Sequence, residues 1–320
     1  MNLIDAYRYL AALHVHRHFG RAAAACHVTQ PALSNALRAL ESQLGCTIVR
    51  RGRQFEGFTA EGERVLAAAH RMLREQEALE QELAEAEHAP RGRLVIGTVP
   101  TALPIAARFA ARLAQRHPGL APRLRSMSSQ DIEAGLESLA IDLALGFTDR
   151  VAGRTSVVTW PQTVEHYFLV GPPERDGSPG STARAGAAAT VTWSEAAAMR
   201  LALLTPEMHH RVLIDRGFAS LGLRVEPVLE TDAVLGLSLA VQAGGLSAVM
   251  PGALVASGVR EAGLRVRRLV EPELLTPVGF MTAAGARPTR ALEAGLALAR
   301  EAAWLAEVRT ISGSLQLAGD

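Results

Sequence analysis

Leucines recur at helical spacing near the N-terminus and predict one buried face of a short helix. The spacing is four, three and four residues, at Leu33, Leu37, Leu40 and Leu44. Thr29 stands where an N-cap is expected, and Pro31 falls in the first turn, where a missing N–H leaves no hydrogen bond unmade. Because Pro31 cannot donate, we expect the Thr29 hydroxyl to accept from the Ala32 N–H.

Polar residues occupy the opposite face of this helix. They are Gln30, Ser34, Asn35 and Arg38. The residues before it indicate a helix with small side chains at 22–25 and a tight turn at His27-Val28. Gln, Ser, Asn and Arg carry donors and acceptors that match base edges in the major groove of DNA. A helix N-terminus that points outward also attracts phosphate.

A basic segment, 48–59 (IVRRGRQFEGFT), follows and predicts a β-hairpin wing. Its arginines are placed to reach the DNA backbone on either side of the helix. An ordinary solvated surface explains each feature alone, but together they favour double-stranded DNA. The candidate DNA-binding residues are Thr29, Gln30, Pro31, Ser34, Asn35, Arg38, Arg50, Arg51 and Arg53.

An acidic segment from about residue 60 to 88 has an apolar residue at every seventh position. The seam is Val65, Met72, Leu79 and Ala86, with Ala69, Gln76 and Leu83 between them. This pattern predicts a long helix that pairs with a copy of itself, although a single amphipathic surface helix is the alternative. Residues 89–92 (APRG) end the helix.

From Arg93 onward, predicted strands and helices alternate in two series. The first is β-α-β-α-β and ends with the strand IDLALGF; the second runs from about Leu201 to Met250, after a Gly/Ser/Ala-rich stretch at 177–189. A strand at PVGFMTAAG and one final helix, roughly 288–305, complete the chain. Such series imply two α/β lobes with a ligand crevice at the carboxyl ends of their strands.

Composition narrows the class of protein. The chain has 320 residues, with 48% hydrophobic and 20% charged residues, as in globular proteins of two or three domains. Its net charge of +1 names no partner, but residues 1–60 are basic and residues 61–88 are acidic. All 33 basic residues are arginine, which we interpret as a compositional bias.

Cysteine usage and the N-terminus favour a cytoplasmic protein. Cys26 and Cys46 show no metal-ligand spacing, so neither a metal nor another cofactor is expected. Asp5 and Arg8 make the N-terminus unlike a signal peptide. The uncharged segment 233–259 is long enough to span a bilayer, but polar residues, glycines and a proline interrupt it. We interpret it as a helix, a Gly-Gly stop and the strand LSAVM, and expect no membrane partner.

Residues 19–45 resemble LysR-type transcriptional regulators, whose pattern F-x-R-A-A-x-x-x-H-V-[ST]-Q-P-A-L-S-x-x-[IL]-R-x-L-E-x-x-L-G they match almost throughout. FTAEGERVL resembles the start of the family's linker helix. Asn35 departs from the family's usual Arg or Lys, which removes a charge contact. Val49-Arg50-Arg51 departs from its usual Phe-x-Arg in the wing.

The resemblance implies a complete architecture. It comprises an all-α winged helix-turn-helix at 1–60, a dimerising linker helix at 61–90, and an α/β periplasmic-binding-protein-like effector domain at 91–310. Lobe I is expected at about 91–161 and 268–310, and lobe II at about 162–267. The resemblance also implies a dimer of dimers on a promoter inverted repeat, a small-molecule effector and contact with RNA polymerase.

On the family pattern, loops facing the crevice hold the effector, a small organic anion. The candidates are Thr101, Ser128, Ser129, Thr205, Pro206, Met208 and His209. Two helix N-termini with hydroxyl side chains offer donors to an anion, although N-capping alone explains each hydroxyl. His209-His210 suggests a metal, but adjacent side chains diverge, so we expect an exposed or capping pair.

The sequence fits other functions less well. A two-lobed enzyme needs a nucleophile and base, and none is apparent; an exported solute-binding protein needs a signal peptide. A redox-responsive LysR-type regulator needs thiols in the sensor half, whereas both cysteines lie in the DNA-binding module, where they are expected to fill the core. An effector-independent repressor is a further alternative. A faint likeness to LysR-type proteins of formate and other one-carbon metabolism hints at one effector class.

Overall fold

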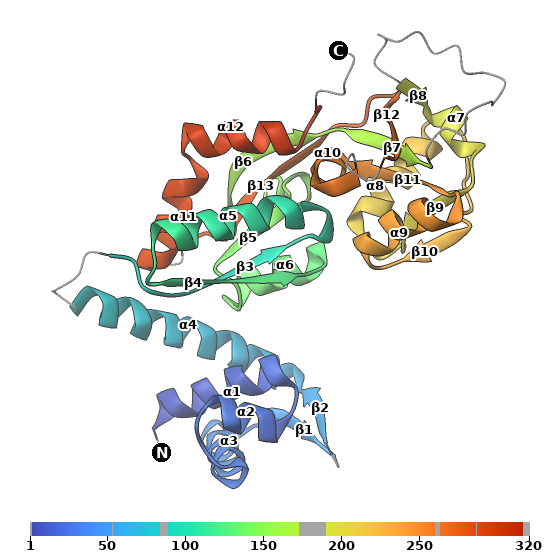
Figure 1. The fold of residues 1–320 in the computed structure, drawn as a ribbon. Helices are drawn as coiled ribbons and strands as arrows, with labels where there is room; N and C mark the ends of the chain where they lie inside the picture. The colour runs from blue at the N-terminus through green and yellow to red at the C-terminus, as the bar shows by residue number, and fades with distance from the viewer. Residues whose placement is uncertain are drawn as a thin grey trace.

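The structure is a computed structural model that describes residues 2–52, 54–83, 89–172, 190–259, 263–285 and 287–315. Three N-terminal helices and a hairpin form the first domain (Figure 1). The helices are α1 (Leu3–His16), α2 (Phe19–Ala25) and α3 (Gln30–Leu44), and the hairpin strands are β1 (Val49–Arg51) and β2 (Phe55–Phe58). Their core contains Leu10, Leu13, Leu33, Leu37 and Leu40, all fully buried.

The predicted leucine stripe is therefore confirmed for its first three members and wrong for the fourth. Leu44 is 44% exposed. It is the last residue of α3, and Gly45 ends the helix in a left-handed conformation. Since the helix stops there, no neighbouring element covers the last leucine of the stripe.

The long helix α4 (Ala60–Leu83) leads from the first domain to the rest of the chain (Figure 1). The start of α4 packs closely against Ile48, the residue before the hairpin. A Cβ atom added to Gly62 would lie only 2.1 Å from the Ile48 carbonyl oxygen. Only glycine allows this contact. Met72 and Leu79 of the predicted seam are 46% and 51% exposed. Residues 84–88, including Ala86 of the seam, lie outside the described residues.

The first lobe is built on a mixed sheet in the order β4-β3-β5-β13-β6. The strands are β3 (Gly92–Thr98), β4 (Leu120–Ser126), β5 (Leu143–Phe147), β6 (Val157–Glu165) and β13 (Thr276–Ala283). β3 pairs in parallel with β4 and β5, as the predicted β-α-β-α-β series requires. Helices α5 (Leu103–Arg116) and α6 (Ser129–Glu137) make the crossovers, and short turns η1 (Pro100–Ala102) and η2 (Asp149–Val151) follow β3 and β5.

The second lobe has a sheet in the order β10-β9-β11-β7-β12-β8. Its strands are β7 (Tyr167–Gly171), β8 (Thr190–Thr192), β9 (Leu201–Leu204), β10 (Leu229–Thr231), β11 (Ser247–Pro251) and β12 (Arg265–Val270). Its helical elements are α7 (Trp193–Ala197), α8 (His209–Ala219), α9 (Val234–Gly244), α10 (Gly252–Leu254) and η3 (Val255–Val259). The uncharged segment forms α9, a left-handed Gly245 and β11, as predicted. The Gly/Ser/Ala-rich stretch at 177–189 lies outside the described residues.

The chain crosses between the lobes twice, at His166 and between Val270 and Thr276. These points lie a few residues beyond the boundaries expected from the sequence. No helix in the described ranges is long and apolar enough to span a bilayer.

The predicted single C-terminal helix is wrong, because two helices occupy this segment. They are α11 (Arg290–Ala299) and α12 (Ala302–Ile311). The Gln162 amide donates to the Ala299 carbonyl oxygen at 3.1 Å, taking the acceptor that a continuous helix would use. The same side chain accepts from the buried Trp304 indole at 2.6 Å. The break between α11 and α12 is thus accompanied by a contact between two residues, Gln162 and Trp304, that are 142 positions apart in the sequence.

Candidate functional site

The helix-turn-helix has the geometry expected from its sequence. Thr29 caps α3, and its Oγ1 accepts from the Ala32 N–H at 3.3 Å. His27 adopts a positive φ of 56° in the turn, and the Val28 N–H donates to the Ala23 carbonyl. These local contacts hold α2 and α3 in the arrangement that DNA-binding helix-turn-helix motifs use.

The polar face of α3 is open to solvent. Thr29, Gln30, Pro31, Asn35 and Arg38 are exposed, and Ser34 is half-buried. Arg38 donates to the Asn35 side chain at 3.3 Å, so these two act as one unit. The surface therefore presents hydrogen-bonding groups beside the N-terminus of α3.

The hairpin wing is tied to α3 by Glu41, a residue that the sequence analysis did not single out. One Glu41 oxygen accepts the N–H groups of Ile48 and Val49 at 2.9 and 3.0 Å, and the other pairs with Arg51 at 2.8 Å. Arg51 is thus held against α3, whereas Arg50 is exposed and has no ion-pair partner among the described residues. Arg53 lies outside the described residues. Glu41 is one of only three acidic residues among seven arginines in 1–60, which is the signal that marks it.

The first-lobe side of the crevice is formed at the carboxyl ends of the parallel strands. Thr101 lies in η1, is 5% exposed and caps no helix, because α5 begins at Leu103 after Ala102. Capping therefore does not explain Thr101. Ser128 does cap α6: its hydroxyl accepts from the Asp131 N–H at 3.1 Å and donates to the Asp131 carboxylate at 2.8 Å. The neighbouring Ser129 hydroxyl oxygen is buried without a hydrogen-bond partner.

The second-lobe side is the turn between β9 and α8. Thr205 is half-buried and its N–H bonds the Thr231 carbonyl; Pro206 is exposed. Met208 precedes α8 and packs on the second-lobe core. In the described part of the chain, none of these three side chains forms a hydrogen bond or ion pair with the first lobe.

His209 is the residue of this turn that reaches the first lobe. Its ring meets Phe147 edge-on at 4.9 Å, and its Nδ1 lies 3.4 Å from Arg150. Its Nε2 lies 3.8 Å from the Asp149 carboxylate, and its side chain is 8% exposed. Burial is the main cause that lowers the pKa of His209. Phe147 and Arg150 also line a cavity of about 10 Å³ beside Ser129, so Ser129 and His209 face the same two residues.

The expectation of an exposed or capping histidine pair is wrong. His210 is 3% exposed, lies 5.6 Å from the Tyr167 ring and has no hydrogen-bond partner on either nitrogen. Burial lowers its pKa to about 3. Both histidines are enclosed because the first turn of α8 packs at the junction of the lobes. Within the described residues, no group of three or more His, Cys, Asp or Glu side chains is arranged to hold a metal.

Phe147, Asp149 and Arg150 were also missed by sequence reasoning. Phe147 is the last residue of β5, and Asp149 and Arg150 follow it, at the edge where the carboxyl ends of β3, β4 and β5 meet. A Phe-Thr-Asp-Arg sequence after a buried parallel strand could have indicated them.

A helix-turn-helix with an exposed polar helix, joined to a two-lobed α/β domain, defines a ligand-responsive DNA-binding protein. Two family models match the chain: "Bacterial regulatory helix-turn-helix protein, lysR family" over residues 4–63 and "LysR substrate binding domain" over residues 87–304. The chain belongs to the LysR family of transcriptional regulators, which are not enzymes.

Named relatives match part of the chain. A "SDS degradation transcriptional activation protein" from a Pseudomonas species is 32% identical over 170 residues, covering 51% of this chain and 56% of that protein. The "DNA-binding transcriptional dual regulator OxyR" of Escherichia coli K12 is 35% identical over 146 residues, covering 45% of this chain and 48% of that protein. The chain thus matches about half the length of these relatives.

Solved structures share the fold over the whole chain. A full-length OxyR variant from Pseudomonas aeruginosa has a TM-score of 0.71 at 20% identity, covering 99% of this chain and all of that one. Full-length CbnR complexed with its target DNA has a TM-score of 0.62 at 18% identity, covering 93% and 98%. These likenesses establish the winged helix-turn-helix and two-lobed architecture.

Proposed function

We propose that this chain is a cytoplasmic transcriptional regulator that binds a promoter inverted repeat as a homodimer or homotetramer. The observation that carries the proposal is the exposed polar face of α3, which lies beside the hairpin wing that Glu41 holds in place. Gln30, Ser34 and Asn35 read base edges, and Arg38 and Arg50 contact the backbone. A two-fold dimer through α4 matches the symmetry of an inverted repeat. RNA polymerase is the further partner through which such a protein acts on transcription.

A gel-shift titration tests DNA binding. Its probe is the DNA upstream of the gene that lies next to the one encoding this chain. Gln30→Ala is expected to weaken binding by about 1–3 kcal/mol and to relax preference at one base pair. Gln43→Ala is the matched control, because Gln43 is exposed in the last turn of the same helix. Equal affinities and preferences for the two variants would refute this assignment of the recognition helix.

A small organic anion bound between the lobes is the proposed effector. Arg150 supplies a cation at the junction, Ser129 supplies an unused hydroxyl, and His209 links the two lobes. Thr101, in η1 after β3, and three residues of the turn before α8, Thr205, Pro206 and Met208, are proposed as further contacts of the anion. The ligand changes transcription only if it binds one lobe arrangement better than another. Because His209 contacts both sides, displacing it couples binding to lobe movement.

Calorimetry against a panel of small carboxylates tests this site with a matched pair of arginines. Arg150 and Arg154 both pair with Glu133, at 2.7 and 3.0 Å, but only Arg150 approaches His209. Arg150→Ala and Ser129→Ala are expected to weaken binding, whereas Arg154→Ala is not. Binding that survives the first two changes would place the effector elsewhere.

Likeness to OxyR favours a second candidate, a peroxide-responsive regulator, since relatives of that name are hydrogen-peroxide-inducible gene activators. The effector-domain residues 91–310 contain no cysteine. Cys26 lies in the DNA-binding domain, and burial raises the pKa of its thiol, which lowers its reactivity. A response to peroxide that survives Cys26→Ser and Cys46→Ser together would show that no thiol is involved.

A further inference from the structure

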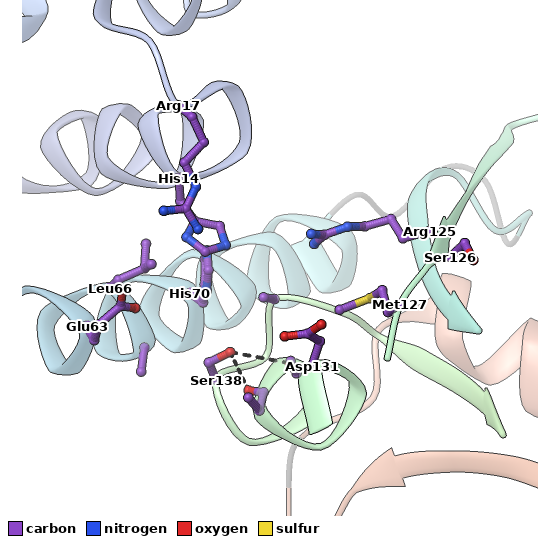
Figure 2. A pocket seen from close by; sticks show the side chains of 14 residues that line it. His14, Arg17, Glu63, Leu66, His70, Arg125, Ser126, Met127, Asp131 and Ser138 are labelled. Carbon is purple, nitrogen blue, oxygen red and sulfur yellow. Dashed lines mark hydrogen bonds between the residues drawn. The ribbon is translucent and has the colours of Figure 1, made fainter. Parts of the chain in front are cut away.

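A pocket of about 480 Å³ lies between the DNA-binding domain and the first lobe, outside both sites described above (Figure 2). Three walls enclose it. The end of α1 contributes His14 and Arg17, α4 contributes His70, and the segment from β4 to α6 contributes Arg125 and Asp131. Any ligand held here touches both domains at once.

Two arginines bring positive charge into this pocket. Figure 2 shows Arg125 extending toward His14 and Arg17. Within the described residues, neither arginine has an ion-pair partner; Arg17 instead lies over the rings of Phe55 and Phe58, at 5.8 and 5.9 Å. Burial, followed by the charges of Arg123 and Arg17, lowers the pKa of Arg125. The cations therefore repel one another across a partly desolvated space.

Two carboxylates, Glu63 and Asp131, also line the pocket, but within the described residues neither forms an ion pair with Arg17 or Arg125. Asp131 raises the pKa of Arg125, but it is hydrogen-bonded to Ser128. Glu63 is exposed. Neither carboxylate contributes to the lowered pKa of His14 or of His70.

The histidines have unused hydrogen-bonding atoms. His14 Nδ1 and His70 Nδ1 are buried without partners, and the rings lie edge to face at 6.1 Å. A hydrogen bond to the Ser138 backbone ties His70 to the first lobe. Burial and nearby cations, Arg17 and Arg125 for His14 and Arg74 and Arg125 for His70, lower the pKa of both rings to about 4. Both rings are therefore neutral at pH 7 and able to take up protons if negative charge arrives.

We propose that this pocket binds a small oxyanion with two negative charges, held by Arg17 and Arg125, and that His14 and His70 take up protons as it binds. The anion supplies a direct ion-pair partner for the arginines and acceptors for the imidazolium N–H groups. Because the walls belong to different domains, the bound anion fixes the DNA-binding domain against the first lobe. The site is distinct from the crevice between the lobes.

Sulfate is the most direct probe, because it remains a dianion across the pH range of the experiment. The full-length protein is titrated with sodium sulfate at pH 6, at ionic strength held constant with chloride, in two buffers of different ionisation enthalpy. Saturable binding with net proton uptake is expected. His14→Asn and His70→Asn should each reduce the uptake. Parallel titrations with succinate and inorganic phosphate at pH 7.5 distinguish a carboxylate from a phosphate as the preferred ligand.

Two substitutions with opposite expected effects on sulfate affinity distinguish a loss of binding from a loss of folding. Arg125→Ala is expected to weaken sulfate binding about tenfold, the effect of losing one charge-assisted hydrogen bond. Asp131→Asn removes a negative charge at nearly constant shape and should tighten binding, a gain that misfolding cannot imitate. Arg108→Ala, an exposed arginine on α5, is the control and should bind as wild type.

The proposal fails if sulfate gives no saturable heat beyond that of chloride. It also fails if folded Arg125→Ala and Asp131→Asn both bind sulfate like wild type, or if binding proceeds with no proton uptake.

Discussion

The Arg74 guanidinium of α4 forms an ion pair with the Asp142 carboxylate of the first lobe, and each side chain is only 12% exposed. Asp142, which directly precedes β5, also accepts a hydrogen bond from the Val95 N–H of β3 at 2.6 Å. Burial raises the pKa of Asp142, and the charge of Arg74 opposes this rise. The pair therefore anchors the linker helix to the domain that is proposed to sense the effector.

Removing Arg74 should be costly, because it leaves Asp142 buried without its counter-charge. Arg74→Ala is expected to lower the free energy of unfolding by about 3–5 kcal/mol. Arg71→Ala, an exposed arginine on the same helix, is the control and should change it by less than about 0.5 kcal/mol. Denaturant titration measures both. Adding Asp142→Asn to Arg74→Ala should recover much of the loss; no recovery would contradict the pairing.

Glu165 makes stability depend on pH. It ends β6 at the first lobe crossing, where Oε2 accepts N–H groups from Ala253 and Gly313 at 3.3 and 3.1 Å and Oε1 has no partner. Burial raises its pKa from 4.5 to about 7. Between these values the folded protein keeps a proton that the unfolded chain releases, so this group lowers stability as pH rises from 4.5 to 7.

Glu165→Gln cannot ionise and should therefore be more stable than wild type at pH 8, by up to about 3 kcal/mol. The difference should shrink toward zero at pH 4. Thermal unfolding at a series of pH values measures it, with Glu226→Gln, in the loop before β10, as the control. A constant difference across the series would contradict a proton held at Glu165.

Met72 and Leu79, the exposed residues of the α4 seam, should hold two copies of the chain together. Leu79→Glu places a charge in the seam and is expected to reduce the mass measured by light scattering. Leu275→Glu is a closely matched control, because Leu79 and Leu275 are 51% and 50% exposed and only the first lies on α4. If both variants keep the wild-type mass, dimerisation through the seam is wrong.

Gln162 should stabilise the break between α11 and α12. Gln162→Ala removes the buried hydrogen bonds that the Gln162 side chain makes with the Trp304 indole N–H and the Ala299 carbonyl oxygen. Each orphaned group costs about 1–3 kcal/mol. We expect a loss in that range or above it by chemical denaturation, with DNA affinity unchanged. Gln43→Ala, exposed at the end of α3, should leave stability unaltered.

Features that depend on neighbours a few residues away follow from the amino-acid sequence alone. The Thr29 cap joins groups three residues apart, and Leu33, Leu37 and Leu40 share a face because of the helical period. The alternation of strands and helices likewise predicted the parallel pairing of β3 with β4 and β5, because a helical crossover returns the chain to run in the same direction. The polar face of α3 followed from the same periodicity.

Contacts between groups far apart in the sequence depend instead on how the domains and lobes fold together. His209 meets Phe147 and Arg150, Arg74 pairs with Asp142, and Gln162 reaches between α11 and α12. None of these contacts has a periodic signature, because each depends on where the chain returns after many residues. Burial then sets the chemistry: desolvation keeps His210 neutral and raises the pKa of Glu165, and no local pattern encodes how much water a side chain loses.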